Sequence, residues 1–180
     1  MVKGYKNIVL GLILATFHIN LGTLPIIPSF IAWIIVAMGV ELIEEAEGQL
    51  SFNRSKKACA ALIILTLLDL IKTNIDISLG SPYMLSILVA LIELFFVYYF
   101  FRGVTQMFEA KGKIEYACEN ERILRRYTVF QIIGILILGV FWLNYSNTQG
   151  ELIAIFMLAL RIYIIYRVNK LGKLCDAEGI

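Results

Sequence analysis

The chain has 180 residues, of which 59% are hydrophobic and 17% charged, and its formal net charge is +2 at pH 7. Globular proteins are on average about half apolar and about a quarter charged, so this composition indicates a membrane protein. The small net charge, dispersed between apolar segments, excludes a nucleic-acid-binding surface. Residues 1–20 have the basic start and apolar centre of a signal peptide, but no small-x-small cleavage site follows. We therefore expect a first membrane helix there.

Six apolar segments have about the 20 residues that a membrane-spanning helix needs. Gly22, Pro25 and Pro28 separate the first two segments, while Ser81 and Pro82 supply an N-cap and a first helical residue for the fourth. We expect one domain over residues 1–180, an all-α bundle of six transmembrane helices. The expected spans are 7–24, 26–46, 58–77, 82–107, 127–145 and 151–169.

Basic residues alternate along the chain in a way that predicts orientation. They gather before the first segment, between the second and third, between the fourth and fifth, and after the sixth. The positive-inside rule therefore predicts a multi-pass protein of the cell membrane with its N-terminus and C-terminus in the cytoplasm. Cys59, Cys118 and Cys175 would then face the reducing side, so we expect free thiols.

An acidic cluster ends the second segment and consists of Glu41, Glu44, Glu45 and Glu47. We favour a solvated helix end whose charges are neutralised by Arg54, Lys56 and Lys57, which follow in the sequence. A cation site built on the four carboxylates is the alternative.

Known intramembrane proteases do not fit the sequence. The prenyl-protein type pairs a Glu-Glu dipeptide with an arginine four residues after the second Glu, and Gln49 occupies that position here. His18 is the single histidine of the chain, and the rhomboid and aspartyl protease motifs are absent. No nucleotide, metal or cofactor motif occurs either, so we expect no cofactor and no catalytic residues.

Charged residues inside the expected spans are the stronger indication of function. Asp69, Glu93 and Arg161 each lie about 10 residues from the outer end of a span, hence about 15 Å deep. A charge at the centre of a spanning helix costs about 2.5–3.5 kcal/mol, so such residues normally face the bundle interior and pair. Because side chains lean toward a helix N-terminus, we expect Lys72 to pair with Asp69 and Arg161 with Glu93.

Two interpretations of these charges stay open. In the first, neutralised pairs hold the helices together, and the protein is a non-enzymatic accessory or scaffold component. In the second, the protein is a small transporter of ions, protons or solutes. Asp69 and Glu93 would then carry protons or bind a cation, Lys72 and Arg161 would set their ionisation, and His18 would mediate access from outside.

Residues 103–126 form the one sizeable polar region. We expect either a solvated connector, with a helix in which Glu121 and Arg125 pair, or a surface that docks anionic lipid or a partner. The expected partners are the lipid bilayer and either another membrane protein or further copies of this chain.

The stretch "NLGTLPIIPSFIAWIIVAMGVELIEEAE", residues 20–47, joins a Gly and two prolines to an aromatic-containing helix that ends in charge. This pattern resembles a segment of small bacterial multi-span membrane proteins without an assigned activity. The resemblance covers the first two expected helices, and it implies an all-helical bacterial membrane protein.

Overall fold

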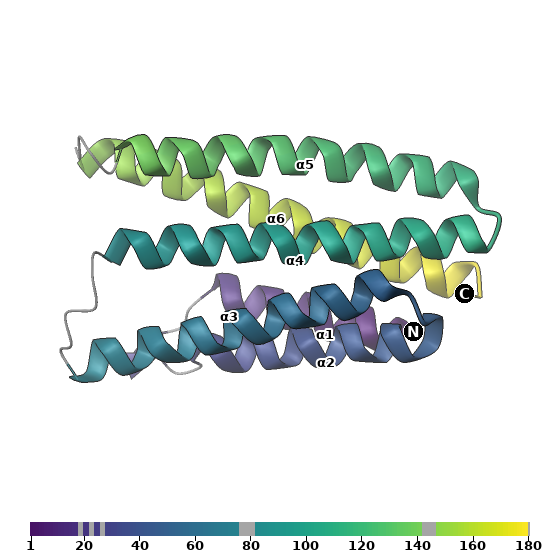
Figure 1. Ribbon diagram of the computed structural model, residues 1–180, viewed down its shortest axis with the longest axis horizontal. Helices are drawn as coiled ribbons and strands as arrows, with labels where there is room; N and C mark the ends of the chain where they lie inside the picture. The colour runs from purple at the N-terminus through teal and green to yellow at the C-terminus, as the bar shows by residue number, and fades with distance from the viewer. Residues whose placement is uncertain (18–19, 22–23, 26–27, 76–81, 142–146, 180) are drawn as a thin grey trace.

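The computed structural model describes residues 1–17, 20–21, 24–25, 28–75, 82–141 and 147–179. Six long α-helices fill most of this part of the chain (Figure 1). In chain order the elements are α1 (Val2–Thr16), β1 (Asn20–Leu21), β2 (Leu24–Pro25), α2 (Ser29–Glu47), α3 (Leu50–Ile75), α4 (Pro82–Ala110), α5 (Ile114–Phe141) and α6 (Asn147–Ala177).

The helix boundaries follow from local chemistry. Pro28 immediately precedes α2 and Pro82 begins α4, since proline has no N–H to lose at a helix start. Gly48 ends α2 at φ 65° and Gly112 lies between α4 and α5 at φ 71°, a left-handed conformation that glycine adopts without strain. The start of α4 at Pro82 was predicted from the sequence, whereas the expected cap Ser81 lies outside the described residues.

The first expected span is wrong at its end, because α1 stops at Thr16 rather than near residue 24. The Thr16 hydroxyl donates to the Leu12 carbonyl at 2.7 Å, and beyond it β1 pairs antiparallel with β2. Two prolines within four residues prevent the helix from continuing to α2. The other five helices begin or end up to 13 residues from the expected positions, and α3, α5 and α6 extend furthest beyond them.

The six helices form a closed ring. Each helix packs against the next, and α6 returns to pack against α1. Figure 1 shows that both chain termini lie at the same end of this bundle, which we call the terminal end; the opposite end is the distal end. An up-and-down ring of this kind places every helix against two neighbours, so each helix has one inner face and one outer face.

Glycines bring α1 and α2 into close contact. A Cβ atom on Gly39 would lie 2.6 Å from the Gly4 carbonyl oxygen, and one on Gly11 would lie 2.7 Å from the Ala32 carbonyl oxygen. No side chain fits at either position unless the helices move apart. Small residues at helix contacts are a common way for membrane helices to associate, because they allow the backbones to approach closely.

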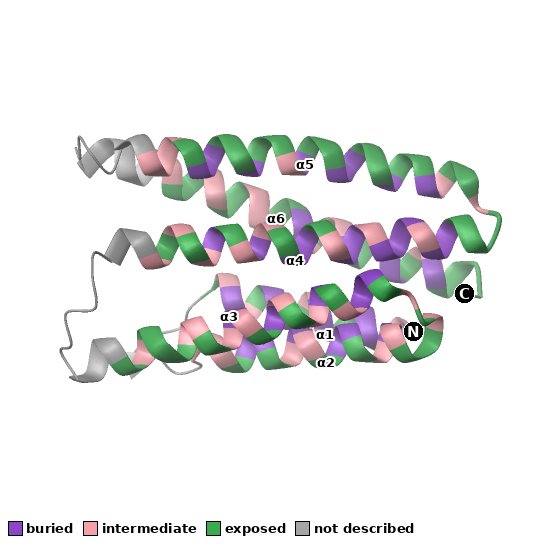
Figure 2. Cartoon of the chain, in the orientation of Figure 1, coloured by how far each residue is buried: buried purple, intermediate pink, exposed green. Residues whose placement is uncertain are grey.

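Burial on the inner faces decreases from the terminal end to the distal end (Figure 2). Leu62 of α3 is fully buried, but Asp69 is exposed although it lies seven residues later, nearly two turns along the same face. Glu93 of α4 is buried, and Ser86 is exposed seven residues before it. Figure 1 shows α3 and α4 diverging toward the distal end, which accounts for this exposure.

Within the described residues, two helical stretches are long and apolar enough to cross a membrane, Leu85–Ala110 of α4 and Leu152–Ala177 of α6. No such stretch occurs among the described residues of the other four helices. The 15 residues of α1 are fewer than the roughly 20 that a span requires. In α2, α3 and α5, charged residues occupy part of the helix, as the four glutamates do at the end of α2.

Candidate functional site

An ion pair between α4 and α6 forms the centre of the candidate site. Arg161 donates through Nε to Glu93 Oε2 at 3.2 Å and through Nη2 to Glu93 Oε1. The sequence predicted this pair. Because α4 and α6 are both neighbours of α5 in the ring, the pair reaches across the interior rather than joining adjacent helices. Both carboxylate oxygens accept from one guanidinium, which is the strong, geometrically specific form of this interaction.

The two partners differ in exposure. The Glu93 side chain is 8% exposed and the Arg161 side chain 35%. The carboxylate is therefore enclosed and neutralised, while part of the arginine side chain remains open to its surroundings. Removing either partner alone would leave a buried or half-buried charge uncompensated.

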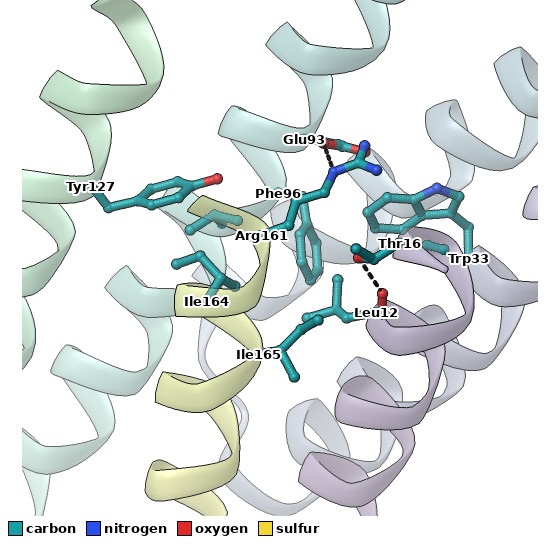
Figure 3. Close-up of a pocket in the computed structure, with 11 residues that line it drawn as sticks. Leu12, Thr16, Trp33, Glu93, Phe96, Tyr127, Arg161, Ile164 and Ile165 are labelled. Carbon is teal, nitrogen blue, oxygen red and sulfur yellow. Dashed lines mark hydrogen bonds and ion pairs between the residues drawn. The ribbon is translucent and has the colours of Figure 1, made fainter. Parts of the chain in front are cut away.

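A small pocket surrounds the ion pair (Figure 3). Trp33, Phe96 and Tyr127 form aromatic walls, and Thr16 of α1 lies near the pair. The region in which the centre of a water molecule can lie is about 20 Å³, room for about one water. Trp33 packs edge-on against Phe96 with ring centroids 5.6 Å apart. Sequence reasoning did not connect Trp33 and Tyr127 with this site, because only the ring order of the helices brings them together.

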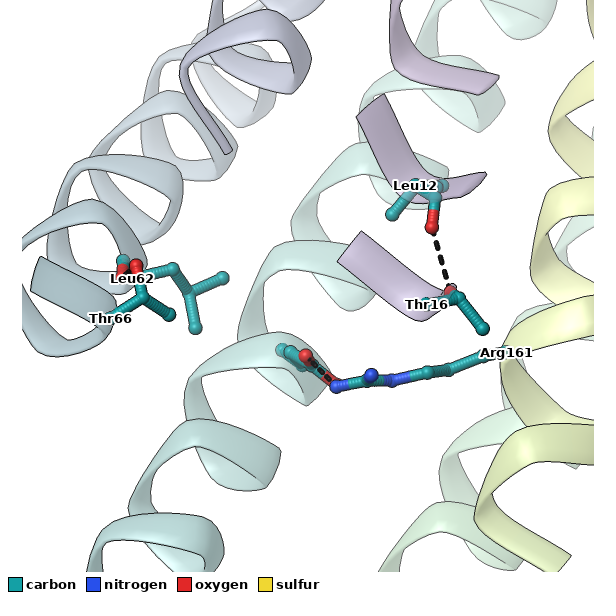
Figure 4. Close-up of polar contacts among 6 residues, drawn as sticks. Leu12, Thr16, Leu62, Thr66 and Arg161 are labelled. Atoms are coloured by element: carbon teal, nitrogen blue, oxygen red, sulfur yellow. Dashed lines mark hydrogen bonds and ion pairs between the residues drawn. The ribbon is translucent and has the colours of Figure 1, made fainter. Parts of the chain in front are cut away.

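Of the other predicted intramembrane residues, the structure describes only the side chain of Asp69, and it does not bring Asp69 to the pair. Asp69 is exposed on α3 and does not line the pocket. Lys72 belongs to α3, but its side chain lies outside the described residues, as does the whole of His18. The predicted pairing of Lys72 with Asp69 therefore remains a prediction. Thr66, one turn before Asp69, donates to the Leu62 carbonyl of its own helix at 2.7 Å, away from Arg161 (Figure 4).

The acidic cluster of α2 makes ion pairs with other parts of the bundle. Lys56 of α3 lies 3.4 Å from Glu41 and 2.8 Å from Glu44, so the expected return of basic residues from α3 occurs through Lys56. Glu47 accepts from Lys111 at 2.6 Å, a contact that the sequence did not suggest. The hydrogen bond from Lys56 lowers the pKa of Glu44. Glu45 is exposed. The cluster is thus a helix end at which two lysines neutralise part of the charge of the four carboxylates.

Further ion pairs join helices at the terminal end. Glu119 of α5 accepts from Arg167 at 3.0 Å and lies 3.6 Å from Lys170, both on α6, and the hydrogen bond from Arg167 lowers the pKa of Glu119. Glu121 lies 4.0 Å from Arg102 of α4 rather than pairing with Arg125 as expected. A pair between helices replaces the expected pair within one helix because α4 presents Arg102 beside α5.

A buried amide adds a second kind of link at this end. Asn120 of α5 donates through Nδ2 to the Phe101 carbonyl and to the Thr105 hydroxyl of α4, both at 2.8 Å. The Thr105 hydroxyl in turn donates to the Phe101 carbonyl at 3.0 Å. Nothing in the sequence indicates this contact, since an asparagine in a polar segment is usually exposed.

Metal ligation and thiol chemistry find no support in the described ranges. No group of three or more His, Cys, Asp or Glu side chains in that part of the chain is placed to hold a metal ion. Cys59 and Cys175 are buried free thiols, and Cys118 is an exposed one. The arrangement at Glu93 and Arg161 can hold two helices together and contact a water-sized group.

Comparisons with known proteins identify no relative. No protein-family model matches the chain, and neither a curated protein nor a solved structure is significantly similar to it.

Proposed function

We propose that this chain is a multi-pass protein of the cell membrane in which all six helices cross the bilayer and both termini lie in the cytoplasm. Exposed large apolar side chains on every helix support this placement, since soluble proteins seldom expose apolar surface so widely. One example from each helix is Leu10, Met38, Ile64, Phe95, Leu136 and Ile155. On α1, α4, α5 and α6 these residues lie farther from the terminal end than the basic residues do, whereas α2 has no basic residue and Lys72 of α3 lies beyond Ile64.

The length of α1 is compatible with this placement. Its 15 residues measure about 22 Å at 1.5 Å per residue, against a hydrocarbon core of about 30 Å. Local thinning of the bilayer accommodates a short helix at a cost of fractions of a kcal/mol per Å. The longer helices α4, α5 and α6 would extend past the hydrocarbon at the terminal end, where their charged residues gather.

We further propose that the protein is a non-enzymatic accessory or scaffold component and that its midplane charges are structural. The two-pronged Arg161–Glu93 pair across the ring carries this proposal. Each carboxylate oxygen already has a donor, and the space beside the pair holds about one water. A carboxylate so occupied is poorly suited to exchange cations, but it holds α4 and α6 together in a medium that supplies no competing hydrogen bonds.

The exposed thiol of Cys118 provides the test of placement. A membrane-impermeant maleimide should label Cys118 in inside-out vesicles and leave it unlabelled in intact cells, because it would lie on the cytoplasmic side. Cys59 and Cys175 are buried and provide the internal background. Labelling of intact cells would contradict the proposed orientation, and recovery of the chain in the soluble fraction would contradict membrane insertion.

The accessory role has a separate test. A tagged full-length chain, extracted in mild detergent, should co-purify with a membrane protein in constant stoichiometry or with further copies of itself. A chain recovered only as a monomer without partners would contradict the scaffold role while leaving the membrane placement intact.

A small transporter is the second candidate, and one observation favours it. The inner faces of α3 and α4 open at the distal end, which exposes Asp69 on a face that is buried two turns earlier. Such an opening could admit a solute as far as the Glu93–Arg161 pair. In liposomes, cation or proton flux that disappears in an Asp69→Asn, Glu93→Gln double variant would establish this function. Equal flux in the double variant would exclude these carboxylates as the path.

A further inference from the structure

Six of the basic residues at the terminal end already make ion pairs with carboxylates. Ion pairs with residues of other elements engage Lys56, Arg102, Lys111, Lys113, Arg167 and Lys170. These pairs neutralise their charges within the bundle. The basic residues at this end that make no ion pair are therefore the ones that can bind an external anion.

Three arginines of α5 form the densest group of such cations. Arg122, Arg125 and Arg126 are all exposed, and none makes an ion pair within the described residues. Their spacing of three and four places them on one face of the helix. Like charges at this spacing repel each other and destabilise the helix, so an anion bound between them would relieve the repulsion. Glu115, on the same face, lies about 10 Å away along the helix axis, too far for an ion pair.

The same face of α5 continues as an apolar track toward the distal end. Val129, Phe130, Ile133 and Leu136 are between 42% and 62% exposed and follow the arginines at helical spacing. From Arg126 to Leu136 the helix rises about 15 Å, half the thickness of the hydrocarbon core. This face of α5 therefore has a group of cations at one end, followed by an apolar strip about as long as one leaflet is thick. A phospholipid has the same dimensions.

We propose that the arginine triad Arg122, Arg125 and Arg126 binds the phosphodiester group of an anionic phospholipid whose acyl chains lie along the apolar track. Guanidinium groups donate two parallel hydrogen bonds to phosphate oxygens, so the arginines can share one headgroup. A zwitterionic headgroup carries its own ammonium, which the triad repels, so the site prefers a net negative lipid. This inference rests on the proposed membrane placement and adds a ligand class to it.

The test uses the full-length chain in lipid nanodiscs, with a fluorophore on Cys118, which lies one turn before Arg122. Spin-labelled phosphatidylglycerol and phosphatidylcholine with identical chains are the probes, and quenching reports which lipid lies beside the label. We expect quenching at about tenfold lower mole fraction for phosphatidylglycerol than for phosphatidylcholine. In an Arg122→Gln, Arg125→Gln, Arg126→Gln variant this preference should disappear.

The matched control is a Lys3→Gln, Lys6→Gln, Lys173→Gln variant, which removes the same charge from exposed residues of the same end. It should keep the preference, and inorganic phosphate at matched ionic strength should not displace the lipid. An arginine variant that keeps the wild-type preference for phosphatidylglycerol would overturn the specific site. A lysine variant that loses this preference as fully as the arginine variant is expected to would also overturn it. Because all six substituted residues are exposed, neither variant should melt at a lower temperature than the wild type in neutral lipid. A chain that does not assemble into nanodiscs would instead refute the membrane placement.

Discussion

The two ends of the bundle are packed in different ways. At the terminal end Tyr5, Phe52, Phe100 and Cys175 are almost completely buried, and ion pairs or buried hydrogen bonds join neighbouring helices. At the distal end Asp69 and Ser86 are exposed on faces that are buried nearer the terminal end. The Glu93–Arg161 pair lies between these two regions, and it crosses the ring where the close packing begins to loosen.

The difference shows what holds such a bundle together. Lipid chains are as apolar as leucine, so burying apolar side chains between helices gains little in a bilayer. In the proposed membrane placement, close backbone contact, dispersion and polar links between helices supply the stability instead. The terminal end has all three, and the distal end of α3 and α4 has lost the close contact. We therefore expect substitutions to be most harmful at the terminal end and least harmful at the distal end.

The largest effect should come from filling the contact between α1 and α2. Gly39→Leu places a Cβ where the Gly4 carbonyl oxygen is 2.6 Å away, so the two helices must separate. Overpacking typically costs 1–3 kcal/mol and occasionally more, and a clash with backbone belongs to the severe cases. We expect no monodisperse protein on size-exclusion chromatography in detergent. Gly139→Ala, where no atom lies within 4 Å of the added Cβ, should behave like the wild type.

A slightly smaller effect is expected at the buried amide of α5. Asn120→Asp removes both donors to Phe101 and Thr105 and puts a carboxylate in a site that is 2% exposed. The free energy of unfolding should fall by about 3 kcal/mol, because a carboxylate loses its hydration in a buried site and the Phe101 carbonyl and Thr105 hydroxyl lose the donors of Asn120. Thermal unfolding would then begin about 6–12 °C lower. The exposed Asn169→Asp is the control, and an equal shift there would show that burial is not the cause.

As the pH falls, the terminal end should be destabilised before the rest of the bundle. Lys56 lowers the pKa of Glu44 and Arg167 lowers that of Glu119, so both ion pairs stabilise the fold above the ordinary carboxyl pKa of 4.5. Their contribution should be lost as the pH falls below that value through the lowered folded-state pKa values. Exposed pairs are each worth about 0.2–1 kcal/mol, which amounts to a few degrees of melting temperature in total.

The corresponding variants separate this effect from general acid denaturation. A Glu44→Gln, Glu119→Gln double variant should melt lower than the wild type at pH 6 and lose less between pH 6 and pH 3. Glu45→Gln removes an exposed glutamate of the same cluster and should retain the full pH dependence. An unchanged pH dependence in the double variant would rule out these two pairs as its source.

The smallest effect is expected at the distal end. Asp69→Asn changes an exposed side chain on the open face of α3, so the free energy of unfolding should change less than in Glu93→Gln, where the enclosed carboxylate that pairs with Arg161 is lost. The measurement is the melting temperature of the variant beside that of Glu93→Gln. A loss as large as that of Glu93→Gln would mean that Asp69 supports the fold as much as the enclosed carboxylate does, and the contrast between the ends would fail.

Local features of the sequence predicted much of this architecture. Apolar segment length indicated six helices, and Pro82 indicated where α4 begins. The direction in which side chains lean along a helix predicted the pairing of Arg161 with Glu93. The position of Lys56, soon after the acidic cluster, predicted that it would return to that cluster. Apart from the Arg161–Glu93 pair, whose partners are 68 positions apart, the information lies within one or two turns of helix or one connection.

The other contacts between distant segments were not predictable in this way. Nothing near Asn120 in the sequence indicates that Phe101 and Thr105 will face it, and the pairing of Glu47 with Lys111 joins residues 64 positions apart. The end of α1 at Thr16 was missed because the apolar pattern continues past it, while turn chemistry decides the boundary. The exposure of Asp69 depends on the divergence of two helices, which composition does not encode.

The structural role of the midplane charges is tested most directly by a double-mutant cycle on Glu93 and Arg161. Glu93→Met and Arg161→Met should each lower the free energy of unfolding by about 3–5 kcal/mol, because each leaves one charge without its partner. The double variant should lose less than the more harmful single substitution, since both charges are then absent. Thermal unfolding of the four proteins in one detergent provides the comparison. Losses that simply add in the double variant would contradict the pairing and its proposed role in holding α4 and α6 together.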